Sequence, residues 1–93
     1  MDGAPSTPDR TAIETMVTHE LAEILERSPE DIDPNTPFSD LGADSLALIE
    51  LVEAIEERLA ASVGPFHIDD EDLEGLTSVR DAVDYVTARL QGS

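Results

Sequence analysis

The chain has 93 residues, of which 40% are hydrophobic, and its 22 acidic residues stand against five arginines and no lysine, for a net charge of −17. This length suffices for one small core and excludes a catalytic cleft between two domains. Nucleic acids and anionic membranes are bound through Lys and Arg clusters, so the charge excludes both as partners and favours basic proteins. The chain has no cysteine, which also excludes disulfides and thiolate metal sites.

The N-terminal run MDGAPSTPDR has neither a positively charged start nor an apolar block, so it does not have the pattern of a signal peptide. No apolar run approaches the length of a membrane span. We therefore expect a soluble, cytoplasmic protein in which residues 1–6 form a flexible lead and residues 7–91 form a single domain. The starting Met1 and this length favour a freestanding protein over part of a longer one.

The first predicted helix has Thr7 as its N-cap and Pro8 as its first residue, and it ends near Glu26. Its apolar residues recur at helical spacing: Ile13, Val17, Leu21 and Ile24.

From residue 27 to residue 44, three prolines each fix a backbone angle and remove a hydrogen-bond donor. This pattern predicts a long ordered loop, and such loops are often functional. The residues expected to anchor it in the core are Ile32, Phe38 and Leu41.

The second predicted helix starts at the segment ADSL and runs to about Ala60. At about 100° per residue, one face is apolar and should point into the core. That face holds Leu48, Leu51, Val52, Ile55 and Leu59. The opposite face carries carboxylates with one leucine among them: Leu46, Glu50, Glu53 and Glu57. An exposed leucine in an acidic stripe is a candidate contact for a partner.

After Ala60, the segment ASVGPFH predicts a loop around Gly64 and Pro65, and DDEDLEGL predicts one short helical turn that ends at Gly75. Thr77 is the expected N-cap of a last helix. The core face of that helix holds Val79, Ala82, Val83, Val86 and Leu90. The sequence thus predicts an all-α fold: a small four-helix bundle of three longer helices and one short helix, with the long ordered loop between the first two helices.

Ser45 follows Asp44 at the start of the acidic helix, where both residue types are ordinary helix caps. A hydrolytic serine would need a base within hydrogen-bond reach. The only histidines are His19 and His67, and distance along the sequence does not by itself exclude either as that base. The serine, however, lacks a glycine-flanked elbow, and the fold is too small to enclose a substrate, so we expect no catalytic residues.

The sequence predicts no metal site. The segment DIDPNTPFSDLG begins like a calcium loop, but Thr36 stands where the turn needs glycine and Gly42 where a bidentate acid is needed. The acidic run DDEDLE is more typical of a solvated helix start.

The stretch LGADSLALIELVEAIEERL, from Leu41 to Leu59, resembles the acyl carrier protein family, because it matches the LGxDSL motif followed by an acidic second helix. The resemblance extends over nearly the whole chain, including LTSVRDAVDYV in the last helix. In that family, a separate phosphopantetheinyl transferase moves 4′-phosphopantetheine from coenzyme A to the motif serine. The resemblance therefore implies that Ser45 is the attachment residue of a non-enzymatic carrier, which explains why it has no base of its own.

Family members present the second helix to basic patches on ketosynthases, acyltransferases and phosphopantetheinyl transferases. Carried over by position, the resemblance implies these docking residues: Asp44, Leu46, Ile49, Glu50, Glu53 and Glu57. It further implies a monomer that carries acyl thioesters and binds neither nucleic acid nor membrane.

Two features depart from the pattern of bacterial fatty-acid carriers: AASVGPFHIDD is longer than the corresponding loop, and Glu53 stands where an apolar residue is common. The exclusive use of arginine, with many Ala and Asp residues, is typical of a GC-rich bacterial genome. This favours polyketide, antibiotic or other specialised-metabolite biosynthesis over fatty acid biosynthesis. The alternatives are a peptidyl or aminoacyl carrier that uses the same serine, and an acidic helical interaction module with no prosthetic group.

Overall fold

The computed structural model describes residues 9–92, without the side chains of residues 70, 91 and 92. The described part of the chain is helical, with one isolated antiparallel bridge between Pro37 and Ser78 and no strand. Its elements are α1 (Arg10–Leu25), η1 (Pro29–Asp31), α2 (Phe38–Leu41), α3 (Ser45–Val63), α4 (Asp70–Leu73) and α5 (Val79–Gly92). The all-α prediction is confirmed, but residues 9–92 contain the short helices α2 and α4 and the 3-10 helix η1, where one short helix was predicted.

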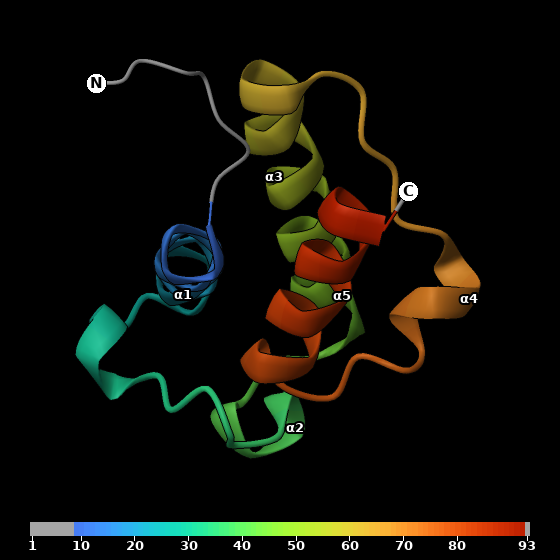
Figure 1. Cartoon of the computed structure of the whole chain (residues 1–93). Coiled ribbons are helices and arrows are strands. Elements are labelled where there is room, and N and C mark those ends of the chain that lie inside the picture. Colours follow the sequence, from blue (N-terminus) through green and yellow to red (C-terminus); the bar gives the residue numbers. More distant parts are fainter. Residues whose placement is uncertain (1–8, 93) are drawn as a thin grey trace.

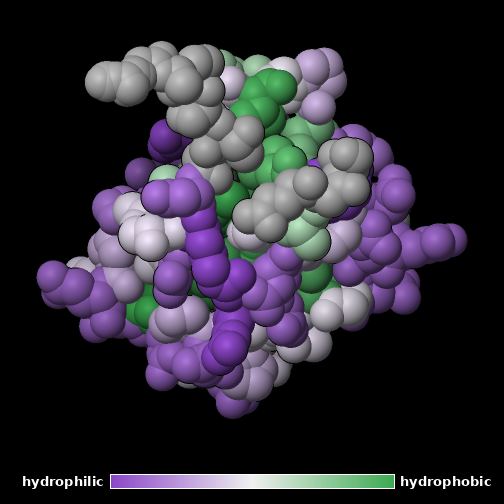
Figure 2. All heavy atoms as spheres, in the orientation of Figure 1, coloured by the Kyte–Doolittle hydropathy of each residue, from purple (hydrophilic) through white to green (hydrophobic). Residues whose placement is uncertain are grey.

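The three long helices surround the core, and α1 packs against both α3 and α5 (Figure 1). In Figure 2, hydrophilic residues cover the left, right and lower parts of this face, and hydrophobic residues appear in its centre and toward its top. The largest fully buried side chains are all aliphatic: Ile13, Val17, Leu21, Ile55, Leu59, Val79, Val83 and Val86. The three long helices therefore share one aliphatic core.

The first helix begins at Arg10, two residues later than predicted, and Thr7 and Pro8 lie outside the described residues. Asp9 is its N-cap, because its Oδ1 accepts a hydrogen bond from the Ala12 N–H at 2.8 Å. At the other end, Glu26 adopts the left-handed conformation with φ 59°, which ends the helix where the sequence predicted.

The three residues expected to anchor the segment after α1 in the core are all buried: Ile32, Phe38 and Leu41. Two backbone hydrogen bonds join this loop to the start of α5. The Phe38 N–H donates to the Thr77 carbonyl at 2.7 Å, and the Arg80 N–H donates to the Pro34 carbonyl at 2.9 Å. The loop is therefore fixed against α5, and this positions the residues that lead into α3.

Helix α3 runs to Val63, so the prediction of a loop from Ala61 to Val63 was wrong. Nothing in that segment breaks a helix before Gly64, whose φ of 98° ends it. The buried face is also rotated from the predicted one: Ala47 joins the core, whereas Leu48 and Val52 are only partly buried.

The last helix begins at Val79, with Ser78 and not Thr77 as its N-cap. The Ser78 carbonyl accepts the first helical bond, from Ala82, and the Ser78 Oγ accepts a hydrogen bond from the Asp81 N–H at 3.3 Å. Thr77 has another role, because its N–H and hydroxyl both donate to the Asp81 carboxylate. The predicted core positions of α5 are buried, except Leu90, which is partly buried.

The Asp81 carboxylate should stabilise the fold in its charged form. The hydrogen bonds from the Thr77 side chain and then the Thr77 backbone hold the pKa of Asp81 below its ordinary value. A lowered folded-state pKa stabilises the fold above the unfolded pKa of about 3.9, and this stabilisation is lost as the pH falls through the folded value.

We therefore expect Asp81→Asn to reduce the free energy of unfolding by about 1 kcal/mol at pH 7 and by less at pH 3. Urea denaturation at the two pH values measures both losses. The control is Asp31→Asn, which changes an exposed carboxylate with no side-chain hydrogen bond to another residue in 9–92 and should have little effect at either pH. An equal loss for Asp81→Asn at pH 3 and pH 7 would contradict the linkage.

Candidate functional site

The turn before α3 brings Ser45 to the surface. Gly42 ends α2 in the left-handed region with φ 89°, and the Ala43 N–H returns to the Phe38 carbonyl at 3.0 Å. A side chain at position 42 would meet only the Arg27 guanidinium, at an ordinary distance of 3.7 Å. The backbone conformation, and not a lack of space, therefore makes glycine suitable at this position.

Asp44 is the N-cap of α3, and this leaves Ser45 without a capping role. The Asp44 Oδ1 accepts a hydrogen bond from the Ala47 N–H at 2.9 Å, and the Asp44 carbonyl accepts the first helical bond, from Leu48, at 3.0 Å. Ser45 is exposed, and its hydroxyl makes no hydrogen bond to any other residue of the described part. The neighbouring Asp44 therefore caps the helix, and the Ser45 hydroxyl does not.

A cavity of about 600 Å³ lies beside Ser45, between α2, the first turn of α3 and the segment that precedes α5. It is lined by Pro37, Phe38, Ser39, Ala43, Asp44, Ser45, Leu48, Leu76 and Thr77. Leu76 and Thr77 were not predicted to lie at this site, since they are more than 30 residues from Ser45 and only the folded chain brings them near it.

These features suit a phosphate ester on Ser45. The first N–H groups of a helix have no partner within the helix, and they lie at the positive end of its dipole, which favours an anion there. At α3, the N–H groups of Ser45 and Leu46 are in this position. The hydroxyl is accessible, and a partly apolar cavity lies next to it for the rest of an attached group.

Neither histidine is placed to serve Ser45 as a base. His67 Nδ1 lies 3.1 Å from a carboxylate oxygen of Glu56. Glu56 is 11 residues along α3 from Ser45, or about 16 Å along the helix axis. His19 is exposed on α1 and lines a groove with the η1 region. The pairing that a hydrolytic serine needs is therefore not formed by residues of the described part.

The six predicted docking residues are all exposed and lie at the start and along the outer side of α3: Asp44, Leu46, Ile49, Glu50, Glu53 and Glu57. Leu46 and Ile49 are 63% and 46% exposed, which is unusual for large hydrophobic residues in this small protein. They are surrounded along the helix by carboxylates. We call these six residues the docking stripe.

No group of three or more His, Asp or Glu side chains within residues 9–92 is arranged to hold a metal ion. None of the helices in this part of the chain is both long enough and apolar enough to cross a membrane.

The chain matches a known protein family over most of its length. The family model described as "Phosphopantetheine attachment site" matches residues 17–86. Two relatives named "Acyl carrier protein", from the DP4 and Hildenborough strains of Nitratidesulfovibrio vulgaris, are each 39% identical over 77 residues, which is 82% of this chain and 95% of theirs.

Acyl carrier proteins are carriers and not catalysts, and they hold a covalently attached 4′-phosphopantetheine. In general they interact with a phosphopantetheinyl transferase and with acyl-handling enzymes. From the family match over residues 17–86 and the identity to these relatives, we conclude that this chain belongs to the acyl carrier protein family.

Proposed function

We propose that this protein carries acyl intermediates as thioesters on a 4′-phosphopantetheine arm attached to Ser45, with residues 7–91 as the carrier domain. The observation that carries the proposal is the division of roles at the start of α3. Asp44 caps the helix, so the exposed Ser45 hydroxyl is left to react and the helix start does not depend on it.

The attachment reaction needs no catalytic group from this chain. The Ser45 oxygen bonds to the coenzyme A phosphorus nearest the pantetheine, the phosphoanhydride bond breaks, and adenosine 3′,5′-bisphosphate leaves. The proton of the serine passes to a base of the transferase. The arm then supplies the thiol on which an acyl group is held, which this cysteine-free chain cannot supply itself.

The docking stripe brings the arm to partner enzymes, among which we propose ketosynthases and acyltransferases with basic patches. Its carboxylates attract such patches over a distance, and Leu46 and Ile49 offer apolar contact once the two proteins meet. The arginine-only composition supports a polyketide or other specialised pathway over fatty acid biosynthesis.

The test is the intact mass after incubation with coenzyme A and a broad-specificity phosphopantetheinyl transferase. We expect one phosphopantetheine to be added to the wild type and none to Ser45→Ala, because the alanine has no oxygen to esterify. Circular dichroism should show the same helicity for both proteins, since Asp44 still caps α3. A folded wild type that gains no mass, or an alanine variant that gains the same mass, would contradict the proposal.

A further inference from the structure

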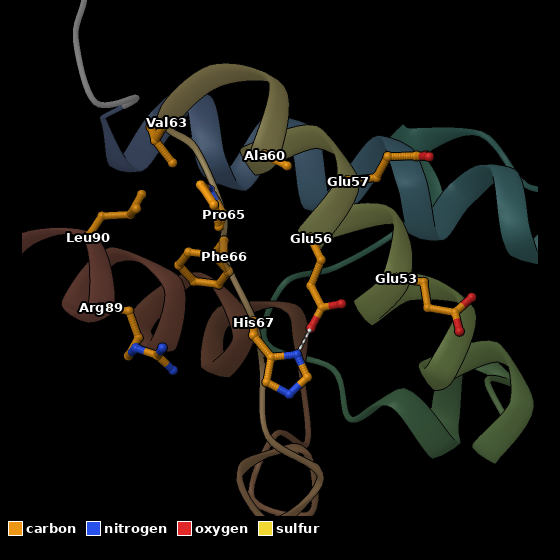
Figure 3. A pocket seen from close by; sticks show the side chains of 10 residues that line it. All are labelled: Glu53, Glu56, Glu57, Ala60, Val63, Pro65, Phe66, His67, Arg89 and Leu90. Atoms are coloured by element: carbon orange, nitrogen blue, oxygen red, sulfur yellow. Dashed lines mark ion pairs between the residues drawn. The ribbon is translucent and has the colours of Figure 1, made fainter.

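A groove lies at the opposite end of α3 from Ser45. The last turns of α3, the segment between α3 and α4, and the end of α5 enclose about 920 Å³. Figure 3 shows that Val63, Pro65, Phe66 and Leu90 gather at one end of this groove, while Glu53 and Glu57 lie toward the other. The groove therefore combines an apolar end with an acidic end.

Contacts across the groove hold its walls in place. The Glu56 carboxylate accepts a hydrogen bond from the Ile68 N–H at 2.7 Å and pairs with His67, which fixes the segment after α3 against the helix. Ile68 is 3% exposed and anchors that segment in the core. On the other wall, the Arg89 guanidinium lies 5.3 Å from the centre of the Phe66 ring. A partner would thus meet a largely formed surface.

The acidic end of the groove is also part of the docking stripe, because Glu53 and Glu57 belong to both. No ion pair occupies either carboxylate within residues 9–92. A second copy of this chain is a poor occupant, since it would bring another net charge of −17. The charge and the apolar end together suit a segment in which lysine or arginine flanks an apolar side chain.

We propose that the phosphopantetheinyl transferase inserts such a side chain between Val63, Phe66 and Leu90, with its flanking cations near Glu53 and Glu57. This rests on the proposed function, because it assumes that the transferase modifies Ser45. A single interface with the transferase can cover both Ser45 and the groove. Val63, at the apolar end of the groove, is 18 residues from Ser45, or about 27 Å along α3. A standard interface of about 800 Å² per partner is about 30 Å across.

The proposal is tested by the kinetics of phosphopantetheine transfer with Val63→Glu and Ala61→Glu. Val63 is 37% exposed and lines the groove, whereas Ala61 is exposed and does not. Both variants add one negative charge at the end of α3, which alone should attract a basic partner slightly more. We expect Val63→Glu to raise the KM for this protein about tenfold, because a carboxylate opposes burial of an apolar side chain, and Ala61→Glu to leave it within about twofold.

A conservative variant distinguishes a loss of binding from a folding defect. Val63→Thr keeps the shape of the side chain and should raise the KM by a smaller factor of about two to three, with helicity unchanged. Similar KM values for Val63→Glu and Ala61→Glu, with the wild type still modified at Ser45, would overturn the groove proposal alone. A wild type that is not modified at all would overturn the proposed function and this proposal together.

Discussion

Ile55→Ala is expected to lower the free energy of unfolding by about 3 kcal/mol. Ile55 lies on the buried side of α3 and is 1% exposed. The surrounding core is almost wholly aliphatic, and α1 packs against both α3 and α5, so the neighbours cannot close the gap without moving a helix. A loss of this size is a large part of the total of about 5–15 kcal/mol expected for a small domain.

The matched control for this change is Ile49→Ala, which removes the same atoms from the same helix at a position that is 46% exposed. It should cost less than about 1 kcal/mol, because nearly half of that residue is already in water. Urea denaturation of the two variants at pH 7 measures the difference. If they lost equal stability, the assignment of Ile55 to the core and Ile49 to the surface would be wrong.

Glu50→Lys is expected to lower the kcat/KM of the transferase about tenfold at low ionic strength. Glu50 lies in the docking stripe between Ile49 and Glu53, and its reversal replaces an attraction to a basic patch by a repulsion. Each unit of charge within about 4 Å is worth on the order of 1 kcal/mol in water, and a tenfold change corresponds to about 1.4 kcal/mol.

The control is Glu23→Lys, which makes the same change in net charge at an exposed position on α1. This variant should behave nearly as the wild type does, since its charge is outside the stripe. Raising the salt concentration should narrow the gap between Glu50→Lys and the wild type, because salt screens exposed charges over about 10 Å at 0.1 M. If the two variants lowered kcat/KM equally, net charge would govern association. If salt did not change the difference between Glu50→Lys and the wild type, packing would govern it.

The three long helices could be predicted from the spacing of their apolar residues, because that spacing reflects which face each helix buries. Short elements have no such periodicity. The four residues of α2 complete barely one turn, so only the burial of Phe38 and Leu41 could be expected and not the helix itself. Gly64 and Pro65 indicate a break in the helix, but the three residues before them neither favour nor oppose helix formation strongly. The sequence therefore does not show that α3 continues to Val63.

The candidate site was predicted from the LGADSL segment, but the hydrogen bonds around it could be described only from the structure. Sequence alone could not decide whether Asp44 or Ser45 caps α3, because both side chains can accept the same N–H. The positions of Leu76 beside Ser45 and of Leu90 beside Val63 could not be predicted, for another reason. These leucines meet their neighbours only through the packing of α5, and a single sequence carries no signal for such distant contacts.

The cap at Asp44 has a thermodynamic consequence for the carrier. A hydroxyl that capped its own helix would lose that hydrogen bond when esterified, so loading and folding would be linked equilibria, each shifting the other. Since the cap belongs to the preceding residue, the two equilibria share no hydrogen bond at the start of α3. If Ser45 carries the arm as proposed, the arm can be gained and lost without breaking the hydrogen bond that caps the helix. Only the favourable interaction of its phosphate with the positive end of α3 then changes.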